Sequence, residues 1–479
     1  MIRALASLYS YRYPAVLVYM LQSTEYRAGP YLAWYWQTNN FGTIAYRREL
    51  AKTRAARMLL LALRLGIAVH IAAALGLIAW WYFGDLRGGF AFGLALLLSY
   101  PVVWAHSIVI PLVMGRLLIV KPKQWRAIQA SKRIFADFTG AKIAIAGSYG
   151  KTSMKELLNI ILSEARNVAA TPANKNVSIS HAYFAQRLTG NEDILIIEYG
   201  EGAPGDVRRF AEITQPTHAI ITGLAPAHLD RYKTVHQAGK DIFAVADFVS
   251  PQALFVNGES SDAADFIKPE YQTYTQQGVL GWTVRDVHVE LEGTRFTMSQ
   301  GSKRMELHSK LLGRHQVGPL ALAAALAEQF GLSAQEIKAG VAKTAPFEHR
   351  MQPYRLGGAW IIDDTYNGNI EGIRAGTQLL KELSGTRKIY VTPGLVDQGK
   401  DSDRVHEEMG RLIAGADPDI VVLMQHSVTK YIKRGLEAGD YKGEIIVEAD
   451  PLDFYNNLQV FVAHGDLVVM QNDWPDNYR

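Results

Sequence analysis

The chain has 479 residues, which is too long for one hydrophobic core, so we expect two or three domains. Its formal net charge is +4 with 20% charged residues, and this near-neutral balance argues against nucleic acid as a partner. The sequence contains no cysteine, which excludes disulfides, thiolate metal sites and cysteine nucleophiles. Any metal ion must therefore be held by oxygen or imidazole ligands.

Two long apolar segments follow one another in the N-terminal third. One runs from Met58 to Phe83 and the other from Phe90 to Gly115, and each is long enough for a helix to cross a bilayer. Because only a short polar link separates them, we predict an all-α transmembrane hairpin. The alternative is a buried helical pair in a soluble protein, but two successive runs of this length exceed the usual soluble helix.

Basic residues flank the hairpin on both outer sides. Before the first segment stand Arg47, Arg48, Lys52, Arg54 and Arg57, and after the second stand Lys121, Lys123 and Arg126. The positive-inside rule then places both flanks, and everything downstream, in the cytoplasm. We therefore expect a multi-pass protein of the inner (cytoplasmic) membrane. Residues 1–46 are rich in tyrosine and tryptophan, which suits either an interfacial segment or ordinary packing.

After Thr139 the pattern changes to short apolar strands that alternate with helical stretches. This alternation predicts an α/β architecture with a mainly parallel sheet. A strand at 142–146 leads into a glycine-containing loop at 147–153 and then into an amphipathic helix at 154–165. Strand, loop and helix in this order predict a phosphate-binding loop.

The loop contains the residue types that phosphate binding needs. Gly147 and Gly150 let backbone N–H groups face phosphate oxygens, and the helix N-terminus adds its positive dipole end. We expect Lys151 to neutralise the β- and γ-phosphates of ATP, and the Thr152 hydroxyl to ligate Mg²⁺. The pattern is a shortened G-x-x-G-K-T, because Ile145 stands where the longer pattern has its first glycine. The same loop offers two further nucleotide-binding candidates, Ser148 and Ser153.

The shortened loop and the motifs after it resemble the Mur ligase family. Residues 171–176, T-P-A-N-K-N, are similar to the T-P-x-N-x-N segment of the branch that adds D-Ala-D-Ala to a muramyl tripeptide. Residues 363–369, D-D-T-Y-N-G-N, are close to the D-D-[ST]-Y-N-A-N signature of that branch, although a strand that ends in a polar turn reads similarly. The resemblance implies a phosphate-loop central domain followed by a Rossmann-like C-terminal domain.

The resemblance also implies a catalytic and metal-binding set around Lys151 and Thr152. Glu198 ends a buried strand at 194–198 and matches the family's magnesium-binding glutamate, although the sequence alone leaves a salt-bridging role equally open. His228 matches a histidine that ligates a second magnesium ion. Lys240 is the candidate for the family's carbamoylated, metal-bridging lysine, and an ungapped comparison places Gly239 there instead.

Further nucleotide contacts follow from the same resemblance. His315 falls in the family's G-x-H-N segment, where Gln316 replaces the usual asparagine. Arg350 matches an arginine at the hinge beside ATP, and a planar guanidinium suits a phosphate or ribose contact. The remaining expected nucleotide contacts are Asn174, Asn176, Asp364, Asn367 and Asn369.

We expect four segments: an interfacial or cytoplasmic segment at 1–57, the hairpin at 58–120, the central ATP-binding domain at 121–347 and the C-terminal domain at 348–479. Strands expected at 388–392, 419–424, 444–447 and 466–470 complete the last of these. Two departures from the family stand out. Gln471 and Asn472 occupy a place where Mur ligases often have lysine and glycine, and the hairpin replaces the family's uridine-nucleotide domain.

The resemblance implies amide formation through an acyl phosphate. Our leading hypothesis is an ATP- and Mg²⁺-dependent ligase acting on a peptidoglycan precursor at the cytoplasmic face of the membrane. Its partners would be a UDP-linked or lipid-linked muramyl peptide and an amino acid or dipeptide. One alternative is a poly-γ-glutamate-type polymer ligase, and another is a catalytically inactive nucleotide-binding membrane scaffold.

Overall fold

The computed structural model describes residues 7–24, 26–38, 41, 50–51, 53–84, 86–172, 175–226, 229–366, 368–396, 398 and 401–472. The chain forms two compact units, the first at Met1–Arg126 and the second at Ala127–Arg479. The secondary structure described in the first unit is all helical, whereas the second unit combines mainly parallel sheets with covering helices.

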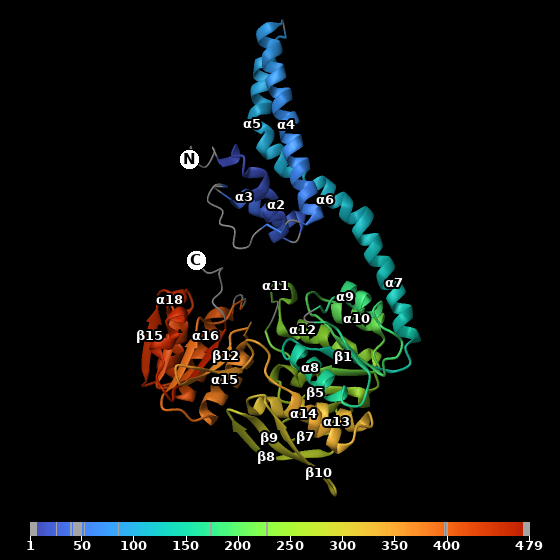
Figure 1. Cartoon of the computed structure of the whole chain (residues 1–479), viewed down its shortest axis with the longest axis vertical. Coiled ribbons are helices and arrows are strands. Elements are labelled where there is room, and N and C mark those ends of the chain that lie inside the picture. The colour runs from blue at the N-terminus through green and yellow to red at the C-terminus, as the bar shows by residue number, and fades with distance from the viewer. Residues whose placement is uncertain are drawn as a thin grey trace. The chain divides into compact units, whose positions relative to one another are not determined.

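The first unit is built on two long helices, α4 (Arg54–Phe83) and α5 (Gly89–Ser107), which lie side by side (Figure 1). The helices approach closely at Gly66, where a Cβ atom would overlap the ring of Trp104. The other helices described there are α2 (Tyr13–Ser23), α3 (Ala28–Gln37), α6 (Val109–Gly115), the π-helical turn η1 (Arg116–Val120) and α7 (Lys121–Asp137), which continues into the second unit.

Aromatic residues of the N-terminal segment pack against α5. Three tyrosine hydroxyls donate hydrogen bonds of 2.8–3.0 Å to the carbonyls of residues 98, 101 and 105, and these belong to Tyr9, Tyr13 and Tyr31. Spacings of three and four residues put these carbonyls on one face of the helix. These three tyrosines therefore pack against α5, and the interfacial reading of residues 1–46 stays a prediction.

The hairpin exposes apolar side chains along its length. Only 11% of the most apolar window of either long helical stretch is buried, and both stretches are long and apolar enough to cross a membrane. At about 1.5 Å per residue, α4 is about 45 Å long, which exceeds the hydrocarbon thickness of a bilayer. Large exposed side chains on it include Leu61, Leu65, Val69, Leu75, Trp80 and Trp81. Contiguous apolar surface of this kind marks contact with a membrane or a partner.

The central domain of the second unit contains, in its described part, a six-stranded sheet in the order β2-β3-β1-β4-β5-β6. All its pairings are parallel, as the alternating pattern predicts. The strands are β1 (Ala141–Ala146), β2 (Val168–Ala170), β3 (Ile194–Glu198), β4 (His218–Ile221), β5 (Leu254–Asn257) and β6 (Gln272–Tyr274). The helices are α8 (Lys151–Leu162), α9 (Ser178–Ala185), α10 (Asp206–Thr214), α11 (Leu229–Tyr232), α12 (Val235–Ile242), η2 (Phe243–Phe248), η3 (Pro251–Ala253) and η4 (Ser261–Phe266).

A second, antiparallel sheet that the sequence analysis does not predict follows in the chain. It has the order β10-β9-β8-β7, with strands β7 (Gly278–Val279), β8 (Trp282–Glu290), β9 (Gly293–Gln300) and β10 (Lys303–Ser309). The alternation of β8 is hard to recognise because the register with β9 shifts between Arg285 and His288. The domain ends with η5 (Arg314–Gln316), α13 (Val317–Gln329) and α14 (Ala334–Lys343).

The C-terminal domain has a sheet in the order β11-β12-β16-β13-β14-β15 among its described residues, antiparallel only at β11. The four strands expected in sequence are present as β13 (Lys388–Thr392), β14 (Ile420–Met424), β15 (Glu444–Glu448) and β16 (Leu467–Gln471). They are preceded by β11 (Gln352–Leu356) and β12 (Ala359–Asp364). The helices are α15 (Ile370–Glu382), α16 (Ser402–Ala416), α17 (Thr429–Ala438), α18 (Pro451–Asn456) and α19 (Leu458–Phe461).

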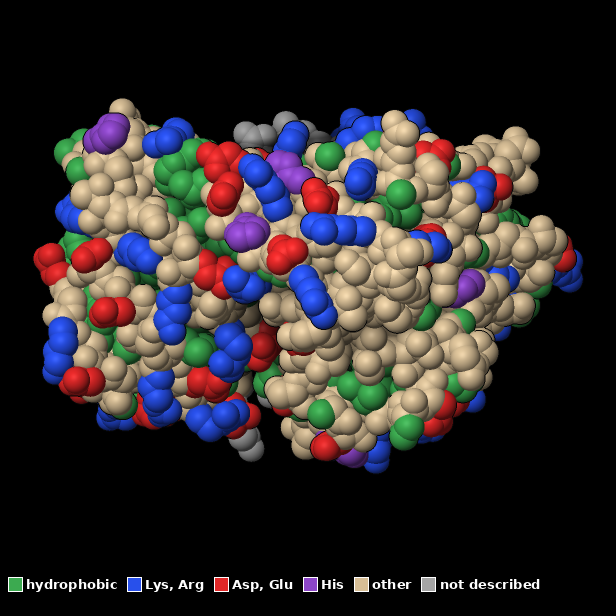
Figure 2. Space-filling view, turned by 90° about the horizontal axis from the view of Figure 1, so that it is seen from below, with side chains coloured by type: hydrophobic (Ala, Val, Ile, Leu, Met, Phe, Trp, Pro, Cys, Tyr) green, Lys and Arg blue, Asp and Glu red, His purple; other side chains and the backbone are tan. Residues whose placement is uncertain are grey.

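The surface of the second unit contrasts with that of the hairpin. Figure 2 shows the face that carries α14 and the antiparallel sheet, where lysine, arginine, aspartate and glutamate side chains are interspersed. Interspersed charges of both signs are typical of a water-exposed surface. The two units therefore present different surfaces to their surroundings.

Gly410 on α16 tests the packing of this helix against α17. A Cβ atom there would overlap the backbone carbonyl of Ile432, so we expect Gly410→Ala to lower the free energy of unfolding by about 1–3 kcal/mol. Gly415 on the same helix has nothing within 4 Å of its Cβ position, so Gly415→Ala should stabilise by up to about 1 kcal/mol. Urea unfolding of both variants measures the difference, and equal effects would contradict close helix packing.

Candidate active site

The predicted phosphate loop lies between β1 and α8 at the carboxyl edge of the central sheet. β1 is flanked by β3 and β4, so the loop sits where the strand order reverses, the usual ligand position in such sheets. Gly147 has φ +144° and Gly150 has φ +73°, which residues with a side chain rarely adopt. A Cβ atom on Gly147 would also overlap the Thr222 side chain, so glycine is required there.

The loop fits a nucleotide phosphate. α8 begins at Lys151, so its first N–H groups, including those of Thr152 and Ser153, are at the loop. The Ser148 hydroxyl is buried and has no hydrogen-bond partner among the described residues. An orphaned hydroxyl, a helix N-terminus and the Lys151 ammonium together form the donor set that a triphosphate requires.

Glu201 is a site residue that the sequence analysis missed. Its carboxylate lies 2.6 Å from the Lys151 ammonium, and both side chains are at most 10% exposed. Lys151 also donates to the carbonyl of Gly147. An acid three residues beyond the end of β3 was the available signal, because strand ends at this edge face the ligand. A nucleotide phosphate bound by Lys151, as the sequence predicts, would have to replace Glu201 as its partner.

Glu198 is the centre of the predicted metal-binding group. Thr152 Oγ1 and Asn176 Nδ2 each donate to Glu198 Oε1 at 3.2 Å. Its other oxygen, Oε2, lies 3.3 Å from the ammonium of Lys155, which is fully buried. The structure therefore brings Thr152, Asn176 and Glu198 together and adds the salt bridge that the sequence left open. Lys155 was missed, although it lies one helical turn after Lys151 on the same face of α8.

The hydroxyl of Thr152 and the carboxylate of Glu198 are oxygen ligands of the kind that Mg²⁺ takes, usually with several waters. Within the ranges that the structure describes, there is no group of three or more His, Cys, Asp or Glu side chains that could hold a metal. Thr152 and Glu198 therefore supply oxygen groups that fit magnesium, and their role as its ligands stays a prediction. Three predicted contacts lie outside the described residues and stay predictions, those of Asn174, His228 and Asn367.

His181 on α9 forms a hydrogen bond with the backbone of Glu198. Its Nε2–H donates to the backbone carbonyl of Glu198 at 2.9 Å, and burial lowers the pKa of His181 to about 4. The imidazole is therefore neutral at physiological pH, with its proton on Nε2. This bond fixes the end of β3, from which the Glu198 side chain projects.

Lys240 lies in a different environment. It is exposed on α12 and lines a surface pocket of about 460 Å³ together with Pro204, Gly205, Arg231, Lys233, Gln237 and Asp241. Neither Thr152 nor Glu198 belongs to this lining. Gly239, the ungapped alternative, is buried, and a Cβ atom there would overlap the ring of Phe266.

On the C-terminal domain, Asp364 is held at the end of β12 by Gln471, one of the departures from the family. The Gln471 amide donates to Asp364 Oδ2 at 2.7 Å and to the Gly372 carbonyl at 2.8 Å, and it accepts from the Tyr390 hydroxyl at 2.6 Å. Burial raises the pKa of Asp364 to about 6. Gln471 therefore has a local structural role in orienting this carboxylate.

Three other predicted nucleotide contacts have defined surroundings. The Arg350 guanidinium lies 4.4 Å from the centre of the Tyr366 ring, a cation–π distance. Asn369 is the N-cap of α15 and accepts from the N–H of Gly372 at 2.9 Å. His315 is partly buried, and its Nε2 lies 2.8 Å from the amide nitrogen of Gln316, which ties the two residues of the altered segment together.

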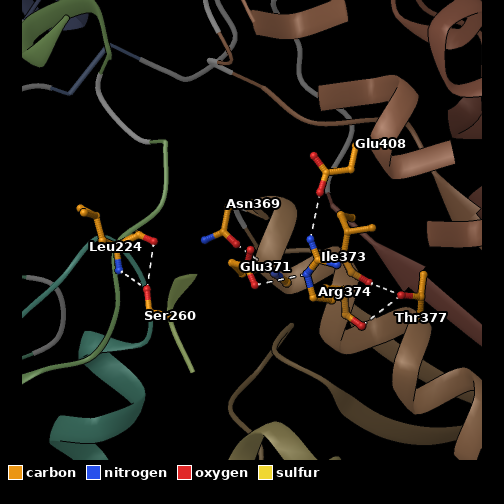
Figure 3. A network of polar contacts seen from close by, with 9 residues as sticks. Leu224, Ser260, Asn369, Glu371, Ile373, Arg374, Thr377 and Glu408 are labelled. Atoms are coloured by element: carbon orange, nitrogen blue, oxygen red, sulfur yellow. Dashed lines mark hydrogen bonds and ion pairs between the residues drawn. The ribbon is translucent and has the colours of Figure 1, made fainter. Parts of the chain in front are cut away.

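The first turn of α15 faces the central domain. Figure 3 shows Arg374 of α15 between Glu371 and Glu408, and Ser260 of the central domain bonded to the backbone of Leu224. Burial raises the pKa of Tyr149 in the phosphate loop to about 12, and the charges of Glu371 and Asp262 act in the same direction. Both domains thus contribute charged groups around the phosphate loop.

Two domain families match this chain. The Mur ligase middle domain matches residues 145–327, and the Mur ligase glutamate ligase domain matches residues 349–471. The chain belongs to the Mur ligase family.

Individual relatives carry more specific names. The UDP-N-acetylmuramoyl-tripeptide–D-alanyl-D-alanine ligase of Mycobacterium leprae is 28% identical over 367 residues, which cover 69% of this chain and 70% of that protein. The similar ligase of Escherichia coli is also 28% identical, over 58% of this chain, and this chain spans only 63% of its length. Part of the length of that ligase therefore lies outside the match.

Solved structures support the fold. MurF from Thermotoga maritima in complex with ADP has a TM-score of 0.63 at 21% identity, covering 73% of this chain and 80% of that chain. The UDP-N-acetylmuramoylalanyl-D-glutamyl-2,6-diaminopimelate–D-alanyl-D-alanyl ligase from Acinetobacter baumannii has a TM-score of 0.60 at 20% identity, covering 73% and 76%. At these identities the likeness establishes the fold.

The Lys151–Glu201 ion pair predicts competition with ATP. Glu201→Gln removes the charge that occupies Lys151 and repels phosphate, so we expect ATP to bind about five-fold more tightly, as for about 1 kcal/mol. Calorimetric titration of ATP into the purified protein measures this. Glu212→Gln, an exposed acid on α10, is the control. Weaker binding in Glu201→Gln would mean that Glu201 belongs to the nucleotide site.

His181 predicts a loss of stability in acid. Its folded pKa of about 4 lies below the ordinary value of 6.5, so its contribution is complete above pH 6.5 and is lost as the pH falls toward 4. His181→Gln keeps an N–H donor but cannot titrate. Between pH 7.5 and pH 5, urea unfolding should show the native protein losing about 2 kcal/mol more than this variant. Equal losses would show that His181 is not the titrating group.

Proposed function

We propose that this protein is an ATP-dependent ligase that forms an amide bond on a peptidoglycan precursor peptide. The observation that carries the proposal is the phosphate loop with Lys151 and Thr152 beside the buried carboxylate of Glu198. This arrangement lies within the part of the chain that matches the Mur ligase middle domain. The names of the relatives supply the class of substrate, a muramyl tripeptide and D-Ala-D-Ala.

Each group at the loop has a separate task. Backbone N–H groups at the start of α8, the Ser148 hydroxyl and Lys151 bind the phosphates of ATP. Thr152 and Glu198 would hold magnesium, with His228 as a further predicted ligand, and the ion would supply positive charge beside the phosphates. Asn176 orients the Glu198 carboxylate through its amide. Lys240 is left out of this set because its exposed side chain lines another pocket.

The C-terminal domain completes the nucleotide site. We assign nucleotide contacts to Arg350, at the start of this domain, and to Asp364, which Gln471 orients. Asn369 brings the first turn of α15 toward the nucleotide, and Asn367 and His315 contribute further polar groups. Closure of the two domains around the ligands would exclude water from the activated carboxylate.

We further propose that the hairpin anchors the protein in the inner membrane, with the catalytic domains in the cytoplasm. The exposed apolar surface of α4 and α5 and the basic residues that flank them support this placement. An anchored ligase would meet a lipid-linked precursor at the membrane surface as readily as it would meet a soluble precursor. The amine that it adds is the dipeptide named for its relatives.

The two alternatives have less support. Relatives named for peptidoglycan precursors favour this substrate class over a poly-γ-glutamate polymer. An inactive scaffold needs none of the polar groups that Lys151, Thr152 and Glu198 place together. The ligase hypothesis therefore accounts for more of the residues at this site than either alternative does.

Turnover of detergent-purified protein tests the proposal. With ATP, Mg²⁺ and D-Ala-D-Ala, we expect ADP and a ligated product from UDP-linked muramyl tripeptide, from lipid-linked muramyl peptide or from both. The measurements are the release of ADP and the mass of the product. Lys151→Ala should reduce turnover at least 100-fold, because it removes the main phosphate-binding charge. Unchanged melting temperature controls for folding. Undiminished turnover in Lys151→Ala would refute the phosphate-loop assignment, and absence of product from both acceptors would refute the ligase.

A further inference from the structure

The surface pocket that contains Lys240 is rich in basic side chains. Arg231 and Lys233 come from the end of α11 and the turn after it, and Lys240 comes from α12. The pocket is about 460 Å³ in volume, enough for part of a peptide. Lys233 has φ +62°, an uncommon conformation for a residue with a side chain, of the kind that recurs at ligand clamps.

The one acidic side chain in the described pocket lining already has partners. The carboxylate of Asp241 accepts from the N–H of Gly205 at 2.6 Å and from the Tyr232 hydroxyl at 2.8 Å. In the part of the chain that the structure describes, no carboxylate forms an ion pair with Lys233 or Lys240. Lys233 and Lys240 therefore bring positive charge to the pocket without an ion-pair partner among the described residues, which favours an anionic ligand.

One loop connects this pocket with the phosphate loop. Glu201 pairs with Lys151 at 2.6 Å, and the next residue, Gly202, accepts from Arg231 Nη1 at 2.8 Å through its carbonyl. Pro204 and Gly205 then line the pocket itself. The four steps from residue 201 to residue 205 span at most about 14 Å. A ligand in the pocket would therefore lie within the length of a short peptide from the γ-phosphate position.

We propose that Lys233 and Lys240 bind free carboxylates of the acid substrate while another carboxylate of the same molecule is activated at the phosphate loop. The inference rests on the proposed ligase function. The acid named for the Acinetobacter baumannii relative contains glutamyl and diaminopimelate residues, which are dicarboxylic acids. Such a peptide keeps free carboxylates close to the one that forms the amide. The short distance to the phosphate loop favours these groups over the diphosphate at the far end of the precursor.

The pocket makes Lys240 a substrate-binding residue, and kinetics separate this role from that of a metal-bridging lysine. Charged hydrogen bonds are typically worth enough to change affinity about 10-fold or more. We expect Lys233→Gln and Lys240→Gln each to raise the KM for the acid substrate about 10-fold, with the KM for ATP changed less than about two-fold. A large fall in kcat with an unchanged KM for the acid would overturn the inference, as would a rise in the KM for ATP.

Lys338→Gln is the matched control, because it removes the same charge from an exposed position on α14 of the same domain. We expect its KM for the acid to equal that of the native protein. An equal rise in this control would mean that net charge, rather than the pocket, attracts the acid, and would overturn the inference.

Equilibrium binding tests the pocket without turnover, so it stays informative if the ligase proposal fails. Calorimetric titration of the full-length protein would use two probes, UDP-linked muramyl tripeptide and the free tripeptide without its sugar nucleotide. We expect the Lys233→Gln, Lys240→Gln double variant to bind both probes at least 10-fold more weakly. A loss confined to the UDP-linked probe would assign the pocket to the diphosphate, and unchanged binding of both would leave it without an acid ligand; either result overturns the inference.

Discussion

The buried carboxylate of Glu198 is the group on which the central site depends. At 2% exposure it has lost most of its hydration, and such a charge is tolerated only when other groups compensate it. The compensation comes from four groups on three segments: the Thr152 hydroxyl and the Lys155 ammonium on α8, the Asn176 amide before α9 and, through the backbone, the His181 imidazole on α9. Because these partners fix one another, the phosphate loop and the end of β3 form one preorganised arrangement.

The C-terminal domain repeats the same principle at its own sheet edge. Asp364 ends β12, next to β16, and Gln471 at the end of β16 holds its carboxylate in a partly buried position. Gln471 departs from the lysine that Mur ligases often have there, yet its amide supplies two donated bonds and one accepted bond. A neutral donor leaves the pKa of Asp364 raised, whereas a lysine would add a positive charge beside it. In this chain Gln471 therefore orients the Asp364 carboxylate without placing a positive charge beside it.

The two units of the chain expose different kinds of side chain. The second unit carries mixed charges on the face seen in Figure 2, whereas the long helices of the first expose leucine, valine and tryptophan side chains. In water such exposure would favour association, and in a bilayer it is satisfied. Tyrosines 9, 13 and 31 donate hydrogen bonds to carbonyls of α5 near Pro101, a proline that lies inside this helix.

Local patterns in the sequence determined much of this protein. The strands β1, β3 and β13, the phosphate loop, the apolar hairpin and the proximity of Thr152 to Glu198 follow from short-range periodicity, glycine placement and the rule that parallel strands end at one edge. Tertiary structure decided the rest, because it depends on which distant segments meet. The pairing of Glu201 with Lys151, the burial of Lys155, the exposure of Lys240 beside Arg231 and the irregular antiparallel sheet β7–β10 each arise from contacts between elements, and one sequence carries no direct record of such contacts.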